Sequence, residues 1–190
     1  MALGMALFAD SVRATETTRV STTLQAMEFN EVATRFTVMP TFVSIDQPDK
    51  RTTDLLVHMN TYEFPKGLEH SGLPDSYKYC EIRFLKDHVT EYVAAIDKYL
   101  QWVGIATQRK DAFTKEIGRV PTWSRASAKL VFEFHSGNDQ EHFLVITMHS
   151  IGVDLGSQVY DPVNAQELKR LLIAFAAGSI QQTDIDSVYK

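Results

Sequence analysis

The chain has 190 residues, of which 44% are hydrophobic, 11% aromatic and 23% charged, and its formal net charge is −5. This composition supplies enough apolar material for a core and argues against wholesale disorder. The acidic balance excludes a bulk basic surface of the kind that duplex-binding proteins usually carry, so binding to nucleic acid would need a local concentration of cations.

The cysteine content and the hydropathy of the chain indicate the cellular compartment in which the protein resides. The single Cys80 excludes an intrachain disulfide and a cysteine-based zinc site, which favours a reducing environment. No apolar run approaches the roughly 18 residues that span a bilayer. We therefore predict an intracellular, cytoplasmic protein with no membrane partner, and the Ser/Thr-rich N-terminal region leaves an organellar matrix open.

Residues 34–45, 53–64 and 77–85 form three extended segments in the first half of the chain, rich in β-branched and aromatic residues. Pro40 interrupts the first of them, which predicts an edge strand, a bulged strand or two short strands. The second carries apolar residues on both faces and is therefore expected to be a central strand.

A helix follows these strands. Apolar residues recur at three- and four-residue intervals between residues 89 and 103, and Asp87 is placed to cap the amino end. The helix either ends at Gly104 or continues through Phe113 and Ile117. Residues 108–115 are the most basic short stretch, and residues 118–127 read as a connection between two halves.

The second half repeats this order. Residues 129–135 alternate strictly between apolar and polar side chains, residues 136–139 are typical of a turn, and residues 142–151 and 157–160 are further strands. Asn164 and Glu167 have the spacing of a capping box, and Pro162 is expected to prevent an earlier helix start.

These patterns predict an α+β protein of two tandem antiparallel sheet-plus-helix units packed as one domain. Residues 33–118 form the first unit and residues 119–180 the second, between an N-terminal arm (1–32) and a C-terminal tail (181–190). Each helix would cover a face that its own strands cannot bury alone. The opposite face of the strands is then expected to be open.

No motif for catalysis or cofactor binding is present. The sequence has no nucleophile elbow, no phosphate-binding loop with its lysine and no dinucleotide fingerprint. None of the six histidines pairs at the helical spacing of a zinc protease. We therefore predict no catalytic residues, no metal site and no cofactor.

Aromatic and basic residues on the predicted strands are the remaining feature. Aromatic side chains on an open sheet can stack unpaired bases, at about 1–3 kcal/mol per base, while cations follow the phosphates. Tyrosines on a sheet can equally be amphipathic sheet residues or contacts for a partner chain. The candidate nucleic-acid-binding residues are Tyr62, Tyr77, Tyr79, Arg83, Lys86, Lys129 and Phe143.

Two tandem strand-rich units, each closed by a helix, resemble the plan of the Whirly and PUR families of single-stranded nucleic-acid-binding proteins. The segments that carry the resemblance are residues 53–64 and 77–103 in one half and residues 129–151 and 157–175 in the other. Those families use four strands per unit, whereas three are clear here, and the Lys-Gly-Lys-Ala-Ala-Leu type run of plant Whirly proteins is missing. The resemblance implies non-enzymatic binding of single-stranded DNA or RNA on a sheet face.

The sequence is also compatible with two other functions. The chain could be a structural or adaptor subunit of a larger protein assembly, docking by strand addition, or a small enzyme or ligand-binding domain with a pocket between sheet and helices. Self-association into a homo-oligomer is open in each case. On the nucleic-acid interpretation, Tyr79 and Arg83 are surface residues whose replacement by alanine weakens oligonucleotide binding and leaves the melting temperature nearly unchanged.

Overall fold

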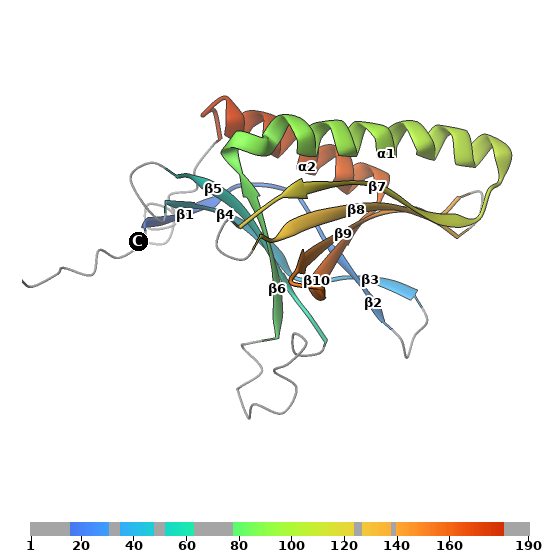
Figure 1. The fold of residues 1–190 in the computed structure, drawn as a ribbon, viewed down its shortest axis with the longest axis horizontal. Coiled ribbons are helices and arrows are strands. Elements are labelled where there is room, and N and C mark those ends of the chain that lie inside the picture. The colour runs from blue at the N-terminus through green and yellow to red at the C-terminus, as the bar shows by residue number, and fades with distance from the viewer. Residues whose placement is uncertain are drawn as a thin grey trace, which may run out of the picture.

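The computed structural model describes residues 16–30, 35–47, 52–62, 78–123, 127–137 and 140–180. Within them the chain forms two antiparallel sheets and two α-helices, which confirms the predicted α+β class. Figure 1 shows both helices lying on the same side of the sheets. No helix among the described residues is long and apolar enough to cross a membrane.

The four-stranded sheet is built from the first half of the chain, whereas the six-stranded sheet joins strands from both halves. The four-stranded sheet has the order β1 (Glu16–Val20), β4 (Thr41–Gln47), β5 (Asp54–Asn60) and β6 (Tyr79–Leu85). The six-stranded sheet has the order β3 (Arg35–Val38), β2 (Met27–Asn30), β10 (Val153–Tyr160), β9 (His142–Ser150), β8 (Lys129–Ser136) and β7 (Phe113–Pro121). Strands β1 and β2 come from the region predicted as an arm, and they join one sheet each.

A short 3₁₀ turn, η2 (Lys86–His88), leads into α1 (Val89–Arg109), and α2 (Pro162–Ala176) follows β10. The two helices contact each other, α1 lies on β7, β8 and β9, and α2 lies on β9 and β10. Tyr92 and Tyr99 of α1 donate their hydroxyls to the carbonyls of Pro121 and His142. These two hydrogen bonds fix the helix over the end of β7 and the start of β9.

The predicted helix caps were wrong. His88, not Asp87, is the N-cap residue of α1, and its side chain makes no capping bond. Asp161 caps α2 by accepting a hydrogen bond from the Asn164 amide at 2.7 Å. Pro162 occupies the first turn, where its missing N–H removes no helical hydrogen bond, so it starts the helix and does not delay it.

Both predicted C-terminal ends of α1 were also wrong, because the helix passes Gly104 and stops before Phe113. Lys110, with a φ of 59°, ends the helix in the left-handed conformation. After two intervening residues the chain enters β7, an edge strand of the six-stranded sheet that straddles the predicted boundary at residue 118. A register shift between Glu116 and Gly118 interrupts its alternation. At Pro40 the structure has two short strands, β3 and β4.

The sheets meet where β10 passes β6. The buried Gln158 side chain donates from Nε2 to the carbonyls of Val57 at 2.9 Å and Cys80 at 3.0 Å, and it accepts from the Tyr160 hydroxyl. A Cβ on Gly156 would lie 2.8 Å from the Cys80 sulfur. This close approach of the two sheets therefore requires a glycine. Burial raises the pKa of the Cys80 thiol to about 12.

We expect Gly156→Ala to lower the free energy of unfolding by about 1–3 kcal/mol, because the added methyl overpacks the crossing of the sheets. Cys80→Ala removes the clashing sulfur, so the double variant should lose less stability than the sum of the two single variants. Urea denaturation measures all three. Gly104→Ala, where a Cβ meets no atom within 4 Å, is the control and should not destabilise. If the double variant loses as much unfolding free energy as the two single variants together, the proposed clash between positions 80 and 156 is contradicted.

Candidate functional site

The structure distributes the residues predicted to bind nucleic acid over both sheets. Tyr62 and Tyr79 lie together at one end of β5 and β6, and they are 45% and 42% exposed. Lys86 lies on η2, with its ammonium 6.0 Å from the ring of Phe175 in α2. Lys129 lies on β8, opposite His149 of β9. Tyr77 is outside the described residues.

Phe143 of β9 is engaged by the chain itself. The ring of Phe36 in β3 lies 4.3 Å from it, and Phe36 also contacts the rings of Phe29 and His135. These contacts pack the edge strand β3 against side chains of β8 and β9 in the same sheet. A base that stacked on Phe143 would therefore compete with Phe36 for part of its ring.

Arg83 lies on the face of the four-stranded sheet that points away from the helices, which we call the outer face. Its guanidinium is 2.7 Å from Asp54, 3.4 Å from Asp46 and 3.3 Å from Glu81. Three carboxylates around one guanidinium leave a formal excess of negative charge. This group of residues disfavours a phosphate, because like charges repel over these distances.

The neighbouring His58 links Ser44 and Glu81 in the order of a catalytic triad. Its Nε2 lies 2.8 Å from the Ser44 hydroxyl, and its Nδ1 lies 3.4 Å from the Glu81 carboxylate. Burial lowers the pKa of His58 below its ordinary value of 6.5, helped by Arg19 and Arg83 and opposed by Glu81. The imidazole is therefore neutral near pH 7.

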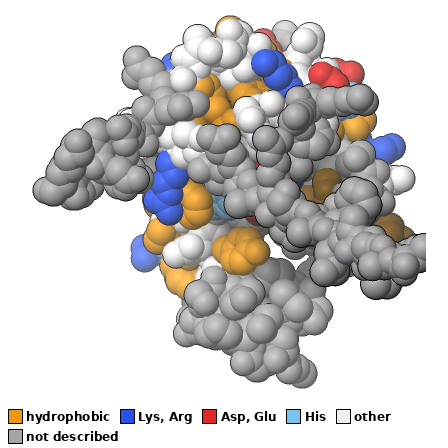
Figure 2. All heavy atoms as spheres, turned by 90° about the vertical axis from the view of Figure 1, so that its left-hand side faces the viewer, with side chains coloured by type: hydrophobic (Ala, Val, Ile, Leu, Met, Phe, Trp, Pro, Cys, Tyr) orange, Lys and Arg blue, Asp and Glu red, His pale blue; other side chains and the backbone are white. Residues whose placement is uncertain are grey.

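This geometry does not make an accessible nucleophile. Ser44 is 1% exposed, and the ring of Phe42 stacks on His58 at 4.3 Å with an interplanar angle of 10°. The Arg19 guanidinium in turn lies 4.5 Å from the centre of the Phe42 ring. Figure 2 shows Lys and Arg side chains scattered among hydrophobic ones on this side of the molecule. We assign the Ser44–His58–Glu81 chain a structural role.

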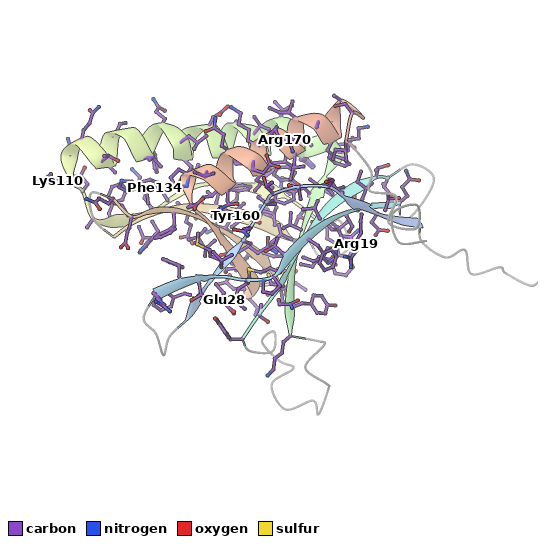
Figure 3. All side chains as sticks on the ribbon, turned by 180° about the vertical axis from the view of Figure 1, so that it is seen from behind. Arg19, Glu28, Lys110, Phe134, Tyr160 and Arg170 are labelled. Carbon is purple, nitrogen blue, oxygen red and sulfur yellow. The ribbon has the colours of Figure 1, made fainter. Side chains whose placement is uncertain are left out.

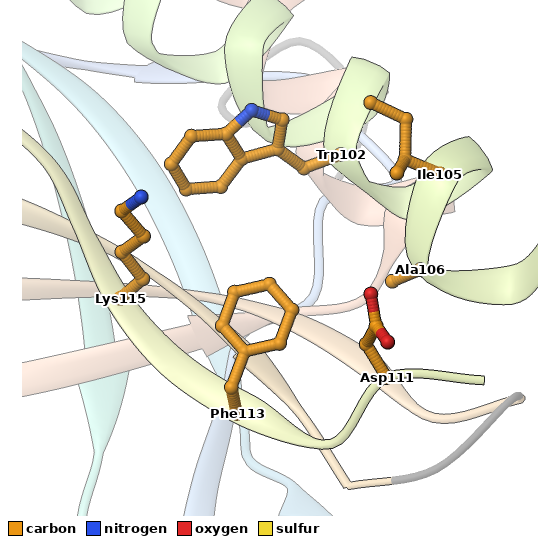
Figure 4. A pocket seen from close by; sticks show the side chains of 6 residues that line it. All are labelled: Trp102, Ile105, Ala106, Asp111, Phe113 and Lys115. Atoms are coloured by element: carbon orange, nitrogen blue, oxygen red, sulfur yellow. The ribbon is translucent and has the colours of Figure 1, made fainter. Parts of the chain in front are cut away.

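Cations and partly exposed rings lie close together at the end of the molecule that carries Lys110. Figure 3 shows this end far from Arg19. A cavity of about 210 Å³ lies between α1 and β7, and we call it the α1–β7 groove. Figure 4 shows the indole of Trp102 and the phenyl ring of Phe113 on opposite sides of it. The groove is lined by Trp102, Ile105, Ala106, Asp111, Phe113 and Lys115.

Two lysines flank the indole. The Lys98 and Lys115 ammonium groups lie 5.1 and 5.4 Å from the Trp102 ring, within the range of cation–π attraction. Lys98 also donates to the Ile117 carbonyl at 3.3 Å. Neither lysine forms an ion pair within the described residues. Their charges are therefore available to an anionic ligand.

The groove rests on a rigid base. The buried ring of Phe134 in β8 lies 5.9 Å from Trp102 and 5.2 Å from Phe113. A side chain fixed by such packing keeps its rotamer, so the two rings on either side of the groove are held before any ligand binds.

The end of α1 adds positive charge. Arg109 and Lys110 close the helix, and Arg109 pairs with Asp111 at 2.6 Å. Cations at the carboxyl end of a helix stabilise it through the helix dipole, so part of their role is structural. The cations beside the groove are therefore Lys98 and Lys115, and the one carboxylate among its lining residues is Asp111.

Sequence reasoning missed Trp102 and Phe113 as functional residues. One local signal was available, because Lys98 and Trp102 are four residues apart and share a helix face. The basic stretch of residues 108–115 was recognised, but one alternative placed it on a continuing helix, away from any groove. Within the described residues, no group of three or more His, Cys, Asp or Glu side chains could hold a metal ion.

The contacts of Arg83 change its expected response to mutation. Arg83→Met should lower the free energy of unfolding by about 2–3 kcal/mol, because it leaves Asp54, whose side chain is 7% exposed, without its cation. Arg119→Met breaks the exposed pair of Arg119 and Glu116 and should cost less than about 1 kcal/mol. Thermal and urea unfolding compare the two. Equal losses would mean that the Arg83 cluster is solvated like an ordinary surface pair.

Comparison with protein-family models, with curated proteins and with solved structures finds no match to this chain. The resemblance to Whirly and PUR proteins therefore stays a prediction from element order. A function has to be inferred from the geometry and charge of the surfaces described above.

Proposed function

We propose that the protein binds single-stranded nucleic acid without catalysing a reaction, and that the α1–β7 groove is the contact surface. The observation that carries the proposal is Trp102 at the edge of a cavity, flanked by the ammonium groups of Lys98 and Lys115, which form no ion pair within the described residues. Stacking rings combined with cations are the usual means by which proteins bind unpaired bases and their phosphates.

Charge favours this groove over the outer face of the four-stranded sheet. On the outer face, the guanidinium of Arg83 is shared among three carboxylates. At the groove, the ammonium groups of Lys98 and Lys115 lie beside Trp102, and Asp111 is the one carboxylate among the lining residues. An acidic protein can bind a polyanion when its cations are concentrated in this way, because exposed charges beyond about 10 Å are largely screened.

Tyr62 and Tyr79 on the outer face are the other aromatic residues on which a base could stack. Both tyrosines are exposed. The main-chain amide of Tyr62, however, donates a hydrogen bond to the Glu28 carboxylate at 2.7 Å, which places a negative charge beside them. We therefore assign these tyrosines at most a supporting role in stacking, and we use Tyr79 to test where the strand binds.

Binding of a fluorescent single-stranded 12-mer tests the proposal. Lys98→Gln combined with Lys115→Gln should weaken binding and reduce the slope of log K against log salt by about 1.4, because each lost phosphate contact removes about 0.7. Trp102→Ala should weaken binding by the equivalent of about 1–3 kcal/mol. Fluorescence anisotropy across a salt series gives both values.

Tyr79→Ala is the matched control on the outer face, and the melting temperature of every variant is measured in parallel. The proposal requires Tyr79→Ala to bind nearly as the wild type does. A loss of affinity in Tyr79→Ala, with the lysine variants unaffected, would move the site to the outer face. No binding by the wild type at low salt would end the proposal.

A second function, that of an adaptor subunit, is favoured by the β9–β10 hairpin. Ile151 at its tip is 87% exposed and has a φ of 49°, followed by Gly152 at 78°. Turns with two positive φ angles prefer Asn-Gly, and a β-branched residue in this conformation is strained. Val153 and Leu155, next along the hairpin, are exposed as well. A strained, exposed isoleucine is explained if a protein partner buries it.

Ile151→Asn tests the adaptor function. The substitution should raise the free energy of unfolding by about 1 kcal/mol, because asparagine tolerates the left-handed conformation, and it should abolish co-purification of a stoichiometric partner. Val153→Asn, at a strand position with ordinary backbone, should give no gain in stability. A loss of stability in Ile151→Asn would show that Ile151 packs within this chain.

A further inference from the structure

The dimensions of the α1–β7 groove restrict what can enter it. Its volume of about 210 Å³ lies below the roughly 300–1,000 Å³ of sites that enclose a whole small molecule. Trp102 and Phe113 face the space from opposite sides. The planes of Trp102 and Phe113 lie at 84° and 38° to that of Phe134 and so are not parallel to each other. The groove therefore suits one flat ring that stacks on one of the two aromatic side chains and meets the other at an angle, with the remainder of the ligand outside.

The two ends of the groove differ in charge. Figure 4 shows the Lys115 ammonium at one end and the Asp111 carboxylate at the other. Asp111 Oδ2 accepts from Arg109 Nε at 2.6 Å, whereas Oδ1 accepts no hydrogen bond within the described residues. A ring that enters must therefore present an N–H group to Asp111, because an ionised carboxylate only accepts hydrogen bonds.

The backbone of Asp111 is held in place by two hydrogen bonds. The Asp111 amide donates to the Ala106 carbonyl at 3.3 Å, and the Asp111 carbonyl accepts from the Ser136 hydroxyl at 2.5 Å. These bonds tie the residue to both α1 and β8. The side chain starts from this anchored backbone and is paired with Arg109, so its carboxylate is positioned at the groove and can discriminate between ligands.

We propose that the groove accepts one unpaired base that carries an exocyclic amino group, and that Asp111 is the residue that selects it. This inference rests on the nucleic-acid binding proposed above. Adenine and cytosine present an amino donor where thymine presents a carbonyl oxygen, and uracil carries the same carbonyl. When position 4 of the base points at Asp111, that oxygen would face the carboxylate, so uracil and thymine are disfavoured in the orientation in which cytosine donates its amino group. Their N3–H lies between two carbonyl oxygens and could approach the carboxylate only with both oxygens beside it. Lys115 and Lys98 then neutralise the phosphates beside the inserted base.

Single-stranded dC12 and dU12 are the sharpest probes, because the two strands differ only at the amino and carbonyl edge of each base. Wild-type protein should bind dC12 about tenfold more tightly than dU12. Asp111→Asn should reduce that ratio to nearly one without weakening dU12, since an amide both donates and accepts. Arg109→Gln breaks the same ion pair but keeps the carboxylate, so its ratio should stay close to that of the wild type.

The outcomes separate the two proposals. If both strands bind equally, or if Asp111→Asn leaves the ratio unchanged, selection by Asp111 is overturned while nucleic-acid binding stands. If neither strand binds the wild type at low salt, the proposed function fails and the selection fails with it. Circular dichroism melting of both variants confirms that the ratios come from folded protein.

Discussion

The architecture depends on the contact between β10 and β6, where the two sheets touch. Gln158 is buried there and bonds to main-chain carbonyls of β5 and β6, and Gly156 leaves room for the Cys80 sulfur. A buried amide is stabilising only when its hydrogen bonds are satisfied. This one is satisfied by both neighbouring sheets, so the requirement for hydrogen bonds fixes how the sheets are placed relative to each other.

The pair of helices covers the six-stranded sheet. Helix α1 lies along β7, β8 and β9, and α2 lies beside it on β9 and β10. The outer face of the four-stranded sheet is left with polar side chains, which bond mainly to each other around Arg83 and His58. An open sheet face is therefore not by itself a binding surface, since its charges can be neutralised within the protein.

The groove between α1 and β7 differs because Lys98 and Lys115 form no ion pair with a carboxylate in the described part of the chain. Trp102 comes from the helix and Phe113 from the edge strand, and both rest on Phe134. Groups held by packing before binding lose little conformational entropy when a ligand arrives. A small cavity lined by packed rings, with these two lysines beside it, is thus a better candidate for binding a polyanion than the sheet face, where three carboxylates surround Arg83.

Most of the elements were predictable, because hydrophobic periodicity is a local property of the chain. The strict alternation before Ser136 and the apolar stripe of α2 arise within a few residues. The strand β7 was missed, since the register shift at Glu116 and Gly118 breaks the alternation that identifies a strand. The break at Pro40 was anticipated because proline has no N–H to donate to a sheet.

The functional surfaces were decided by tertiary structure. By itself, the sequence determined the class of fold, the two helices and the presence of aromatic and basic residues. It could not show that the carboxylates around Arg83 come from β4, β5 and β6, or that Lys115 reaches the indole of Trp102. Such contacts depend on strand register and on how the helices cross the sheets. Both are set by packing of the whole core, which no local pattern encodes.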